Sequence, residues 1–517
     1  MTEALRIAAV ASEASPLARG GGAGDVLGAL ARAVAARGHE VLLFLPAYRD
    51  LTFPAGARRE TAVAELRVPG ASGLEPASLI RVRLPDAPGL TVLLVQHHGD
   101  RRFFDRPGLW LEPATGARYP DNAERYAFFG RAVLEGLKAL DWKPDMIHAL
   151  DARAAWTLGY LRRTYAEDSL FTRTGALLTA LDLGDQEPQA ADTLVALGLA
   201  EDAQDPWAKF KGDDQVPLLK VALRHADLVV LPSRRYAADV LVGRERARGL
   251  AGVLAAREKD TVGIVPGIDT VSWDPANDAS IAAQYDARDV AGKAACRRAL
   301  AERAGWPTDP AESTFDWPIV GMIARLTGEE GLGALASAME RILALDVRLF
   351  VLGLGERTYH ALFEDVARSH PERVFARLTF DDRLAREIVA GADAFLLPQH
   401  HAPGARQALR SLRYGTPPIA HASGAFADAI TDFDPAAGTG TGFLYESPDA
   451  DGLLGALERA IDAHRQPAVW RRAVRNALSC DTSYAATAAA YEDAYRDVRR
   501  RVEARRFSLW ALGVARQ

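Results

Sequence analysis

The sequence predicts an α/β protein built from two doubly wound parallel sheets. Apolar runs of strand length alternate with longer amphipathic stretches, and these runs fall into two series separated by a polar, proline-bearing stretch. A chain of 517 residues is also too long for one hydrophobic core, so two domains are expected on length alone. We predict domains at residues 1–265 and 266–483, followed by a C-terminal segment at 484–517.

The first series opens with a strand, a glycine-rich loop and a helix. Residues 5–10 are short and apolar like a buried strand, residues 20–25 form the loop, and residues 26–37 have helical spacing. A strand at 41–45 completes a βαβ unit, which is typical of a parallel sheet with right-handed crossovers. The other strands expected in this series are 90–95, 146–149, 176–180 and 228–231.

The second series follows a connecting stretch at 265–317, which carries one predicted helix at 291–303. Its first elements are a strand at 319–323 and a helix at 332–345. The later strands are expected at 348–354, 394–397 and 418–420. A long helical pattern at 484–502 lies outside this second sheet, and we expect it to pack back on the N-terminal domain.

Composition excludes several classes of protein. The net charge of −6 argues against a nucleic-acid partner, which usually requires a basic face. Two cysteines, Cys296 and Cys480, are too few for a disulfide framework or a Cys-rich zinc site, and we expect no metal and no cofactor. The N-terminus lacks the basic region of a signal peptide, and no run approaches the roughly 18–20 apolar residues of a membrane span. These features predict a cytoplasmic protein with no membrane partner.

Several segments are more specific than the strand pattern. The N-terminal segment VASEASPLARGGGAGDVLGALARAVAARGHEV resembles the opening of bacterial glycogen and starch synthases. Further segments resemble the same family in order along the chain: FFDRPGLW (103–110), YPDNAERYAFFGRAVLEGLKALDWKPDMIHALD (119–151), PGIDTVSWDP (266–275), ARLTGEEGL (324–332), GADAFLLP (391–398), LRYGTPP (412–418) and TGFLYESPD (441–449). The resemblance implies a GT-B fold, in which two Rossmann-like domains face a deep cleft.

The resemblance also implies an activity. The family transfers glucose from ADP-glucose to the non-reducing end of an α-1,4-glucan, with retention of configuration and without a metal. An arginine and a lysine of the C-terminal domain help the nucleoside diphosphate to leave, and a carboxylate there holds the sugar hydroxyls. A histidine and the glycine-rich loop of the N-terminal domain complete the donor site.

In the N-terminal domain the family's lysine-bearing glycine loop is similar to residues 19–25 of this chain. Arg19 replaces the lysine and keeps its charge but not its shape. The N–H groups around Gly21 and Gly22 would bind phosphate or sugar oxygens, and Asp25 would hold an acceptor hydroxyl. The alternative is an ordinary turn between strand and helix, and the sequence does not decide between the two.

The family's reactive histidine is replaced by Leu181, which can neither donate nor accept a hydrogen bond. The neighbouring asparagine and tyrosine are replaced by Asp182 and Asp185. These two residues form either a carboxylate pair or part of a solvated loop, and we favour the loop.

In the C-terminal domain Arg325 matches the family's arginine, but the lysine is replaced by Glu330 and the sugar-holding glutamate by Ala402. The replacement at 330 reverses a charge that should face the diphosphate. No lysine follows Lys293, so only an arginine of this domain could compensate. The candidates are Arg406 and Arg410.

Other positions keep some binding potential. Phe380 falls where an aromatic ring of the family stacks on the adenine, and Ser423 and Gly424 fall in a turn that contacts phosphate. His400 and His401 form either a cationic or metal-binding pair or two ordinary loop residues, and we favour the latter.

The sequence therefore predicts a synthase-like protein with impaired or absent glucosyltransferase activity. It would act by binding α-glucan, ADP-glucose or another nucleotide sugar, or an active synthase paralogue. The alternative is an active retaining transferase whose remodelled site uses Arg19, Asp25 and Arg325. A periplasmic type of two-domain binding protein is disfavoured by the lack of a signal peptide and by the extended resemblance.

Overall fold

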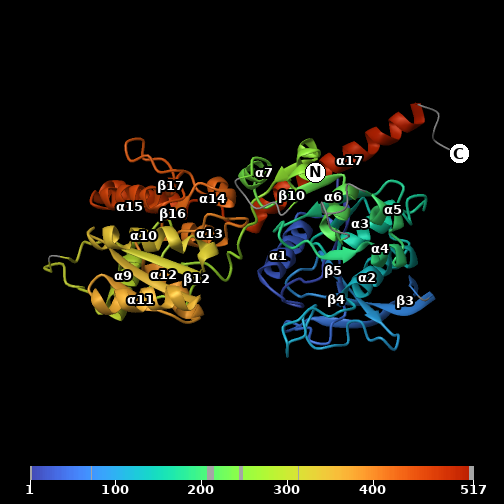
Figure 1. Ribbon diagram of the computed structural model, residues 1–517, viewed down its shortest axis with the longest axis horizontal. Coiled ribbons are helices and arrows are strands. Elements are labelled where there is room, and N and C mark those ends of the chain that lie inside the picture. Colours follow the sequence, from blue (N-terminus) through green and yellow to red (C-terminus); the bar gives the residue numbers. More distant parts are fainter. Residues whose placement is uncertain (1–2, 72, 206–214, 244–248, 313, 512–517) are drawn as a thin grey trace. The chain divides into compact units, whose positions relative to one another are not determined.

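The computed structural model describes residues 3–71, 73–205, 215–243, 249–312 and 314–511. Two compact units are formed (Figure 1). Unit 1 comprises Met1–Pro232, Val240–Ile264 and Tyr484–Gln517, and unit 2 comprises Ser233–Asp239 and Val265–Ser483. Within the described residues, no helix combines the length and the apolar character needed to cross a membrane.

Unit 1 contains a nine-stranded sheet with the order β11-β10-β7-β6-β1-β2-β5-β4-β3. All neighbouring pairs from β11 to β5 are parallel, as the βαβ pattern predicts. The strands are β1 (Arg6–Val10), β2 (Glu40–Pro46), β3 (Arg58–Gly70), β4 (Gly73–Arg83), β5 (Leu90–His97), β6 (Met146–Ala149), β7 (Gly175–Thr179), β10 (Leu228–Leu231) and β11 (Thr261–Gly263). A separate antiparallel pair is formed by β8 (Pro188–Ala190) and β9 (Gln215–Pro217).

Helices surround this sheet. Those of unit 1 are α1 (Gly22–Ala36), α2 (Asn122–Ala139), α3 (Ala155–Arg162), α4 (Ala191–Ala196), α5 (Ala200–Gln204), α6 (Leu218–His225), α8 (Ala251–Ala255) and α17 (Tyr484–Ala511), together with a 3₁₀ turn, η1 (Glu258–Asp260). Helix α7 (Arg234–Leu241) begins in unit 2 and ends in unit 1.

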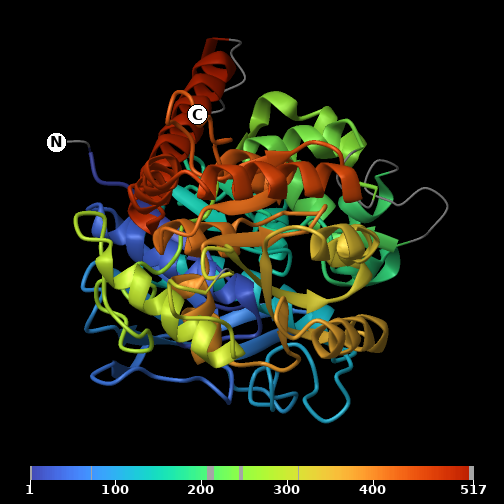
Figure 2. The ribbon, with the colours of Figure 1, turned by 90° about the vertical axis from the view of Figure 1, so that its left-hand side faces the viewer.

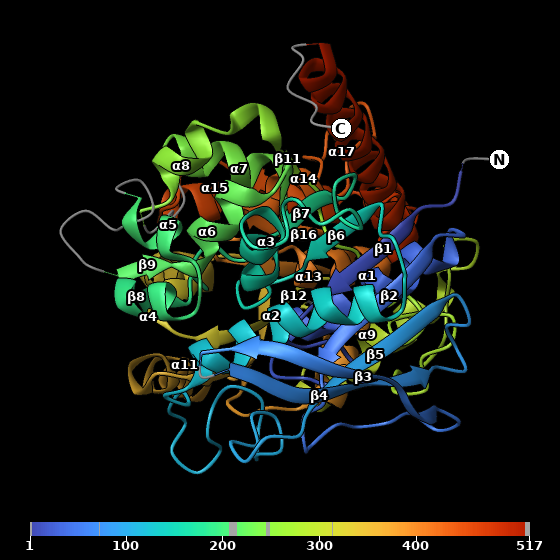
Figure 3. The same cartoon turned by 90° about the vertical axis from the view of Figure 1, so that its right-hand side faces the viewer.

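The antiparallel edge made by β3 and β4 was not predicted (Figure 3). Most side chains of β3 are exposed or half-buried, and its pairing with β4 is interrupted by register shifts between Arg59 and Ala64. An edge strand with a bulge buries little apolar surface, so it lacks the continuous apolar run that marks the central strands. Strand β3 therefore leaves only a weak signal in the sequence.

Helix α17 completes the core of unit 1 and packs against α1 and β7, all three of which are labelled in Figure 3. Tyr491 and Tyr495 are fully buried, and their hydroxyls lie 2.9 Å from the Thr179 hydroxyl and from Nδ1 of His148, respectively. Nε2 of His148 lies 2.7 Å from the same Thr179 hydroxyl, which closes a buried polar network. The segment after residue 483 is thus part of the first unit's interior.

The buried histidine makes the stability of unit 1 sensitive to acid. Burial lowers the pKa of His148 to about 3, so the native state excludes a proton that the unfolded chain takes up near pH 6.5. Stability is therefore lost as the pH falls from 6.5 toward 3, by roughly 2–3 kcal/mol at pH 4.5. Urea unfolding at pH 7.5 and 4.5 should show a smaller pH effect for His148→Gln than for the wild type. His370→Gln, at a half-exposed site, should keep the wild-type pH dependence; equal dependence in all three proteins would contradict this assignment.

Unit 2 contains a six-stranded sheet in which every neighbouring pair is parallel. Its order, β14-β13-β12-β15-β16-β17, is that of a Rossmann fold. The strands are β12 (Ile319–Leu326), β13 (Arg348–Gly355), β14 (Val374–Arg377), β15 (Ala394–Leu397), β16 (Pro418–His421) and β17 (Phe443–Tyr445).

Helices lie on both sides of this sheet (Figures 1 and 2), and α10 packs with α15 while α9 packs with α12. The helices of unit 2 are α9 (Ala291–Ala304), α10 (Leu332–Leu343), α11 (Arg357–Ser369), α12 (Asp382–Gly391), α13 (Arg406–Arg413), α14 (Gly424–Ala429), α15 (Ala450–His464) and α16 (Pro467–Leu478), with a 3₁₀ turn, η2 (Gly328–Glu330).

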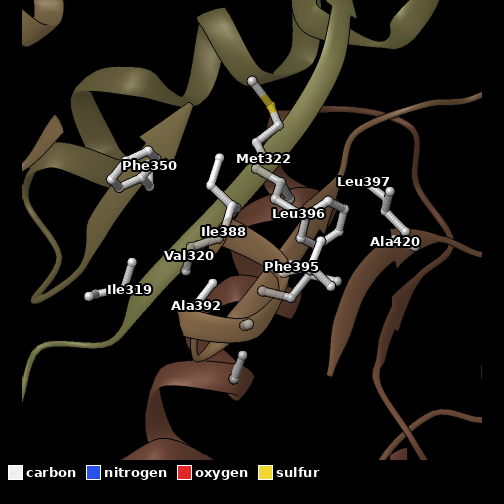
Figure 4. Packing of buried hydrophobic residues seen from close by; sticks show 14 of the residues in the cluster. Ile319, Val320, Met322, Phe350, Ile388, Ala392, Phe395, Leu396, Leu397 and Ala420 are labelled. Atoms are coloured by element: carbon white, nitrogen blue, oxygen red, sulfur yellow. The ribbon is translucent and has the colours of Figure 1, made fainter. Parts of the chain in front are cut away.

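The core of unit 2 is built around β12, whose side chains meet those of α12 and β15 (Figure 4). Gly321 in the middle of β12 allows this contact. A Cβ at that position would lie 2.6 Å from Cγ2 of Ile388 and 3.0 Å from Cβ of Ala392, both on α12 or at its end. The glycine therefore sets how closely α12 approaches the sheet.

The last lysine of the chain belongs to this scaffold. Nζ of Lys293 donates to the carbonyls of Ala390 and Tyr414, at 3.0 and 3.2 Å, and to the Thr416 hydroxyl at 2.7 Å. Burial lowers its pKa to about 8. Because these carbonyls lie at the C-terminal ends of α12 and α13, the lysine caps two helices and is not available to a ligand.

Candidate functional site

Each large sheet has a point where the strand order reverses around its first strand. In unit 1, β1 lies between β2 and β6, and in unit 2, β12 lies between β13 and β15. Ligands of doubly wound sheets bind at the carboxyl ends of the strands next to such a point. The candidate site residues of each unit are found at these two positions.

In unit 1 the glycine-rich loop is held by a buried carboxylate that follows β1. The N–H groups of Gly20 and Gly21 donate to Oε2 of Glu13, at 2.7 and 2.9 Å. Glu13 is 5% exposed, and a Cβ at Gly24 would lie 2.6 Å from the same carboxylate oxygen. These glycines therefore accommodate the carboxylate of Glu13, and of the two N–H groups assigned to phosphate or sugar oxygens, that of Gly21 already donates to this carboxylate.

The helix after this loop starts earlier than predicted. Helix α1 begins at Gly22, not at Val26, so Gly22 is its first residue and Asp25 lies in its first turn. An acidic side chain there is favoured by the helix dipole. Asp25 also forms an ion pair with Arg19 at 3.0 Å, in which the arginine side chain is 68% exposed.

A charged network lies beside the loop, where β6 ends. Oδ2 of Asp151 accepts the Ser12 N–H at 2.6 Å, which ties the end of β6 to the end of β1. Two residues later, Arg153 is buried and contacts the buried Glu187 at 2.5 Å and Asp185 at 3.4 Å. Its guanidinium lies 4.0 Å from the ring centre of Trp110, over the ring face.

Burial controls the protonation of this network. Burial raises the pKa of Glu13, although the two hydrogen bonds from the glycines act to lower it. Burial also raises the pKa of Asp151, although the nearby positive charge of Arg153 acts to lower it. For Arg153 burial alone would lower the pKa, but the Asp185 and Glu187 carboxylates outweigh it, so the pKa is raised. The arginine is therefore the fixed charge around which the carboxylates are arranged.

The segment after β7 carries the substituted histidine position. Leu181 is half-buried and packs against the core of unit 1. Asp182 is exposed and its carboxylate accepts the Gly184 N–H at 2.7 Å, as in a local turn. Because Asp185 turns to Arg153, the two aspartates serve different partners.

In unit 2, the turn after β12 brings together the retained arginine and the reversed charge. Nη2 and Nε of Arg325 lie 3.2 and 3.3 Å from Oε1 of Glu330. The Arg325 side chain is 79% exposed, whereas the Glu330 side chain is 17% exposed. The glutamate thus partly neutralises the cation that the family uses at this position.

Gly331 ends this turn with a φ of 74°, in the left-handed region that favours glycine. A Cβ there would lie 1.8 Å from the carbonyl oxygen of Pro398 and 3.2 Å from Nε2 of His400. Only glycine therefore lets the turn after β12 approach the segment that follows β15.

The phosphate-type turn after β16 has its donors engaged. The Ser423 N–H donates to the His421 carbonyl at 2.8 Å, and the Gly424 N–H donates to the buried carboxylate of Asp239 at 3.1 Å. Ala402 is buried, and its carbonyl accepts the Ala425 N–H at 2.7 Å. These three N–H groups support the fold of unit 2.

The two adjacent histidines point to different neighbours. The ring centre of His400 lies 5.5 Å from that of His421, while the ring centre of His401 lies 6.1 Å from that of Tyr236. Among the residues that the structure describes, no group of three or more His, Cys, Asp or Glu side chains is arranged to hold a metal ion.

The remaining candidates differ in what surrounds them. Arg410 lies 3.9 Å from the ring centre of Trp273, over the ring face, and Arg406 is the first residue of α13. Phe380 precedes α12 and is 78% exposed, so its ring face is open to a ligand.

Sequence reasoning missed Glu13, Trp110 and Arg153 as members of the unit 1 cluster. Each lies in or directly after a segment that resembles the family, and Arg153 follows the end of β6 closely. The position of Arg153 just past a buried strand could have identified it as a site residue. The contact between Arg153 and Glu187 could not have been predicted, because the two residues lie far apart in the sequence.

Two family models match the chain. The starch synthase catalytic domain matches residues 6–256, and glycosyl transferases group 1 matches residues 309–477. A glycogen synthase of Anaeromyxobacter dehalogenans (strain 2CP-1) is 37% identical over 497 residues, covering 95% of this chain and 99% of the relative. A glycogen synthase of Moorella thermoacetica is 32% identical over 515 residues, covering 99% of this chain and 100% of the relative.

Two solved structures of glycosyltransferases are similar in fold to this chain. The catalytic domain of starch synthase IV from Arabidopsis thaliana, bound to ADP and acarbose, superposes with a TM-score of 0.79 at 28% identity, covering 96% of this chain and 100% of that one. Sucrose-phosphate synthase from Thermosynechococcus elongatus gives a TM-score of 0.54 at 17% identity, over 95% and 98% of the two chains, and supports the fold alone. The chain therefore belongs to the glycogen and starch synthase family of glycosyltransferases and has the GT-B fold with two Rossmann-like domains.

Proposed function

We propose that this member of the family binds a nucleotide sugar and α-glucan but transfers glucose slowly or not at all. The observation that carries the proposal is the ion pair between Arg325 and Glu330 at 3.2 Å. In the family a lysine in place of this glutamate would add a second positive charge for the departing diphosphate. Here Glu330 puts a negative charge at that position and pairs with the one retained cation, Arg325.

The size of the effect follows from simple electrostatics. A unit charge about 4 Å from another contributes roughly 4 kcal/mol at an effective dielectric constant near 20. The change from lysine to glutamate removes an attraction and adds a repulsion of that order, and solvent around the exposed Arg325 screens both. Even half of the combined effect, about 4 kcal/mol, lowers the rate by roughly three powers of ten.

Two further replacements act in the same direction. Leu181 offers no hydrogen bond where the family has a histidine, and Ala402 offers no carboxylate for the sugar hydroxyls. Without a metal, polar groups of this kind supply most of the stabilisation of the transition state. Each unit nevertheless keeps a large buried hydrophobic core, which suits a folded pseudoenzyme whose role is binding.

Binding of nucleotide sugar and glucan is supported by the relative that holds ADP and acarbose. The exposed ring of Phe380 is available for stacking on a base. Such a protein would act in a regulatory role in glycogen metabolism, next to an active synthase that makes the polymer.

The direct test is transfer of radiolabelled glucose from ADP-glucose to glycogen primer. We expect turnover at least a thousandfold below the roughly 1–10³ s⁻¹ of typical enzymes. Binding of ADP and of maltoheptaose, measured by calorimetry on the same preparation, should remain detectable. Turnover in the ordinary range would reject the proposal.

An active transferase with a remodelled site is the second candidate. It is favoured by the side chains of Arg19 and Arg325, which are 68% and 79% exposed and can therefore reach a ligand. The same assay run with ADP-glucose and UDP-glucose separates the candidates, because only this one predicts turnover with either donor.

A further inference from the structure

A cavity of about 420 Å³ opens at the edge of the unit 1 sheet where its parallel strands begin. Its walls come from the ends of α3 and α6, from the residues that precede β10 and β11, and from α17. The glycine-rich loop lies at the other edge of the same sheet, after the end of β1. The cavity is therefore separate from the candidate site of this unit. Its lining contains two aspartates and five arginines, the arginines being Arg162, Arg224, Arg257, Arg501 and Arg505.

Asp227, just before β10, is shared by two of these arginines. Its Oδ2 accepts from Nη2 of Arg162 at 2.6 Å, and its Oδ1 accepts from Arg505 of α17. Burial lowers the pKa of Arg162 although the Asp227 carboxylate acts to raise it, and the charge of Arg505 lowers it further. One carboxylate therefore does not fully compensate the two positive charges beside it.

Asp260, just before β11, is shared in the same way. It contacts Arg501 of α17 and lies 3.4 Å from Nη2 of Arg257. Arg501 has a second carboxylate partner, Asp497, at 2.8 Å, and Arg257 also donates to the Ala226 carbonyl at 2.7 Å. Each aspartate of the cavity thus joins an arginine of α17 to an arginine from the body of unit 1.

Three of the arginines keep accessible surface and donors for a ligand. The side chains of Arg224, Arg501 and Arg505 are 40%, 33% and 50% exposed. Arg224 contacts Asp205, which does not line the cavity. A guanidinium carries five N–H donors, so contacts with one or two carboxylates leave others for a further anion. These side chains can therefore hold an anion from two sides, α6 and α17.

Phosphate is the anion that suits this lining best. Each phosphate group brings several acceptor oxygens and up to two negative charges, and the planar fork of arginine binds it with two parallel hydrogen bonds. The volume lies within the roughly 300–1,000 Å³ of small-molecule sites, so a diphosphate or a phosphate ester fits. A nucleic acid would instead need an extended basic face, whereas this chain has a net charge of −6.

We propose that this cavity binds a small anion with one or more phosphate groups, which Arg224, Arg501 and Arg505 hold. The site goes beyond the nucleotide-sugar and glucan binding proposed above, because it lies at the opposite edge of the unit 1 sheet from the glycine-rich loop. A bound anion also ties α17 to the body of unit 1, so it stabilises the folded unit.

The experiment is calorimetric titration of the full-length protein with inorganic pyrophosphate and, separately, with orthophosphate, at pH 7.5 and constant ionic strength. We expect pyrophosphate to bind more tightly than orthophosphate, because the arginines of two helices can contact both of its phosphate groups. Arg224→Gln/Arg505→Gln should bind pyrophosphate at least about tenfold more weakly than the wild type. Both side chains are partly exposed, and Asp227 keeps its bond to Arg162, so this variant is expected to fold.

The matched control removes two charges elsewhere. Arg368→Gln/Arg465→Gln changes two exposed arginines of unit 2, whose side chains are 73% and 57% exposed. This control should bind pyrophosphate like the wild type, because the net charge changes equally in both variants. A tenfold loss in the control as well would mean that overall charge governs the affinity, which would overturn the inference.

Three other results would also reject the site. The wild type could bind neither pyrophosphate nor orthophosphate, or Arg224→Gln/Arg505→Gln could bind pyrophosphate as tightly as the wild type. A single-stranded oligonucleotide could bind more tightly than pyrophosphate and lose its affinity in the same variant, in which case the ligand is a nucleic acid and not a small anion.

A second measurement needs no variant. Hydrogen–deuterium exchange of the wild type with and without pyrophosphate should show slower exchange in peptides around Arg224 of α6 and around Arg505 of α17, since the anion ties these helices together. Protection confined to unit 2 would contradict the assignment, whatever the affinity.

Discussion

Restoring three side chains is expected to raise the rate of glucose transfer by at least about a thousandfold. The variant Leu181→His/Glu330→Lys/Ala402→Glu returns a hydrogen-bonding group, a cation and a carboxylate to the positions where the family has them. Loss of one such electrostatic group commonly lowers a rate by about 10²–10³, and groups that act together give effects far from additive. The measurement is initial transfer from ADP-glucose to glycogen.

The matched control moves the new lysine by one residue. Leu181→His/Glu329→Lys/Ala402→Glu has the same net charge, but Glu329 is exposed and the Arg325–Glu330 pair is left in place. We expect the control to gain less than a tenth of the rate gained by the first variant. Because Ala402 is buried, thermal unfolding of both variants must first show an intact fold. Equal rates in the two variants would contradict the role of charge at residue 330.

Removal of the Arg153 guanidinium is expected to destabilise unit 1 by about 3–5 kcal/mol. Arg153→Met keeps much of the side-chain volume but leaves the buried Glu187, which is 4% exposed, without its buried partner at 2.5 Å. Loss of the buried partner of a buried ion pair is strongly destabilising, and the half-exposed Arg118, which also contacts Glu187, compensates only part of that loss. The contact with the face of Trp110 is lost as well. Chemical denaturation followed by circular dichroism measures the effect.

The same glutamate supplies the control. Arg118 contacts Glu187 at 2.5 Å, but its side chain is 53% exposed. Arg118→Met should therefore cost less than about 1 kcal/mol, as exposed ion pairs usually do. The double variant Arg153→Met/Glu187→Gln should recover much of the stability lost by Arg153→Met alone. A similar cost for both arginines would mean that burial does not govern this network.

The parallel framework of the protein was predictable because buried strands and amphipathic helices leave periodic patterns. The strands at β5, β6 and β10 begin at the predicted residues, and the order of elements follows the two predicted series. Strand β3 was missed because most of its side chains are exposed or half-buried and it lacks a continuous apolar run. Helix α1 begins at Gly22, four residues before the predicted start at Val26. The prediction missed these residues because glycine has a low helix propensity, so Gly22 and Gly24 gave no sign of a helix.

The candidate site was only partly predictable. The sequence identified the charge reversal at Glu330, since that change is visible against the family pattern. It did not indicate that Glu330 would bind Arg325 within the same turn, because pairing depends on the path of the backbone through Gly331. It also placed His400 beside His401, whereas the sheet places it beside His421 from a different strand. Contacts between strands distant in sequence are set by sheet order, which no local pattern encodes.

The position of α17 has a consequence for biosynthesis. Tyr491, Tyr495 and Val498 fill the interior of unit 1, yet the ribosome adds them only after all of Val265–Ser483 has been translated. At about 5–20 residues per second this delay is on the order of 10–40 seconds. During that time the nascent first unit exposes an apolar groove that only the C-terminus can fill, so chaperone binding to the growing chain is expected at this stage.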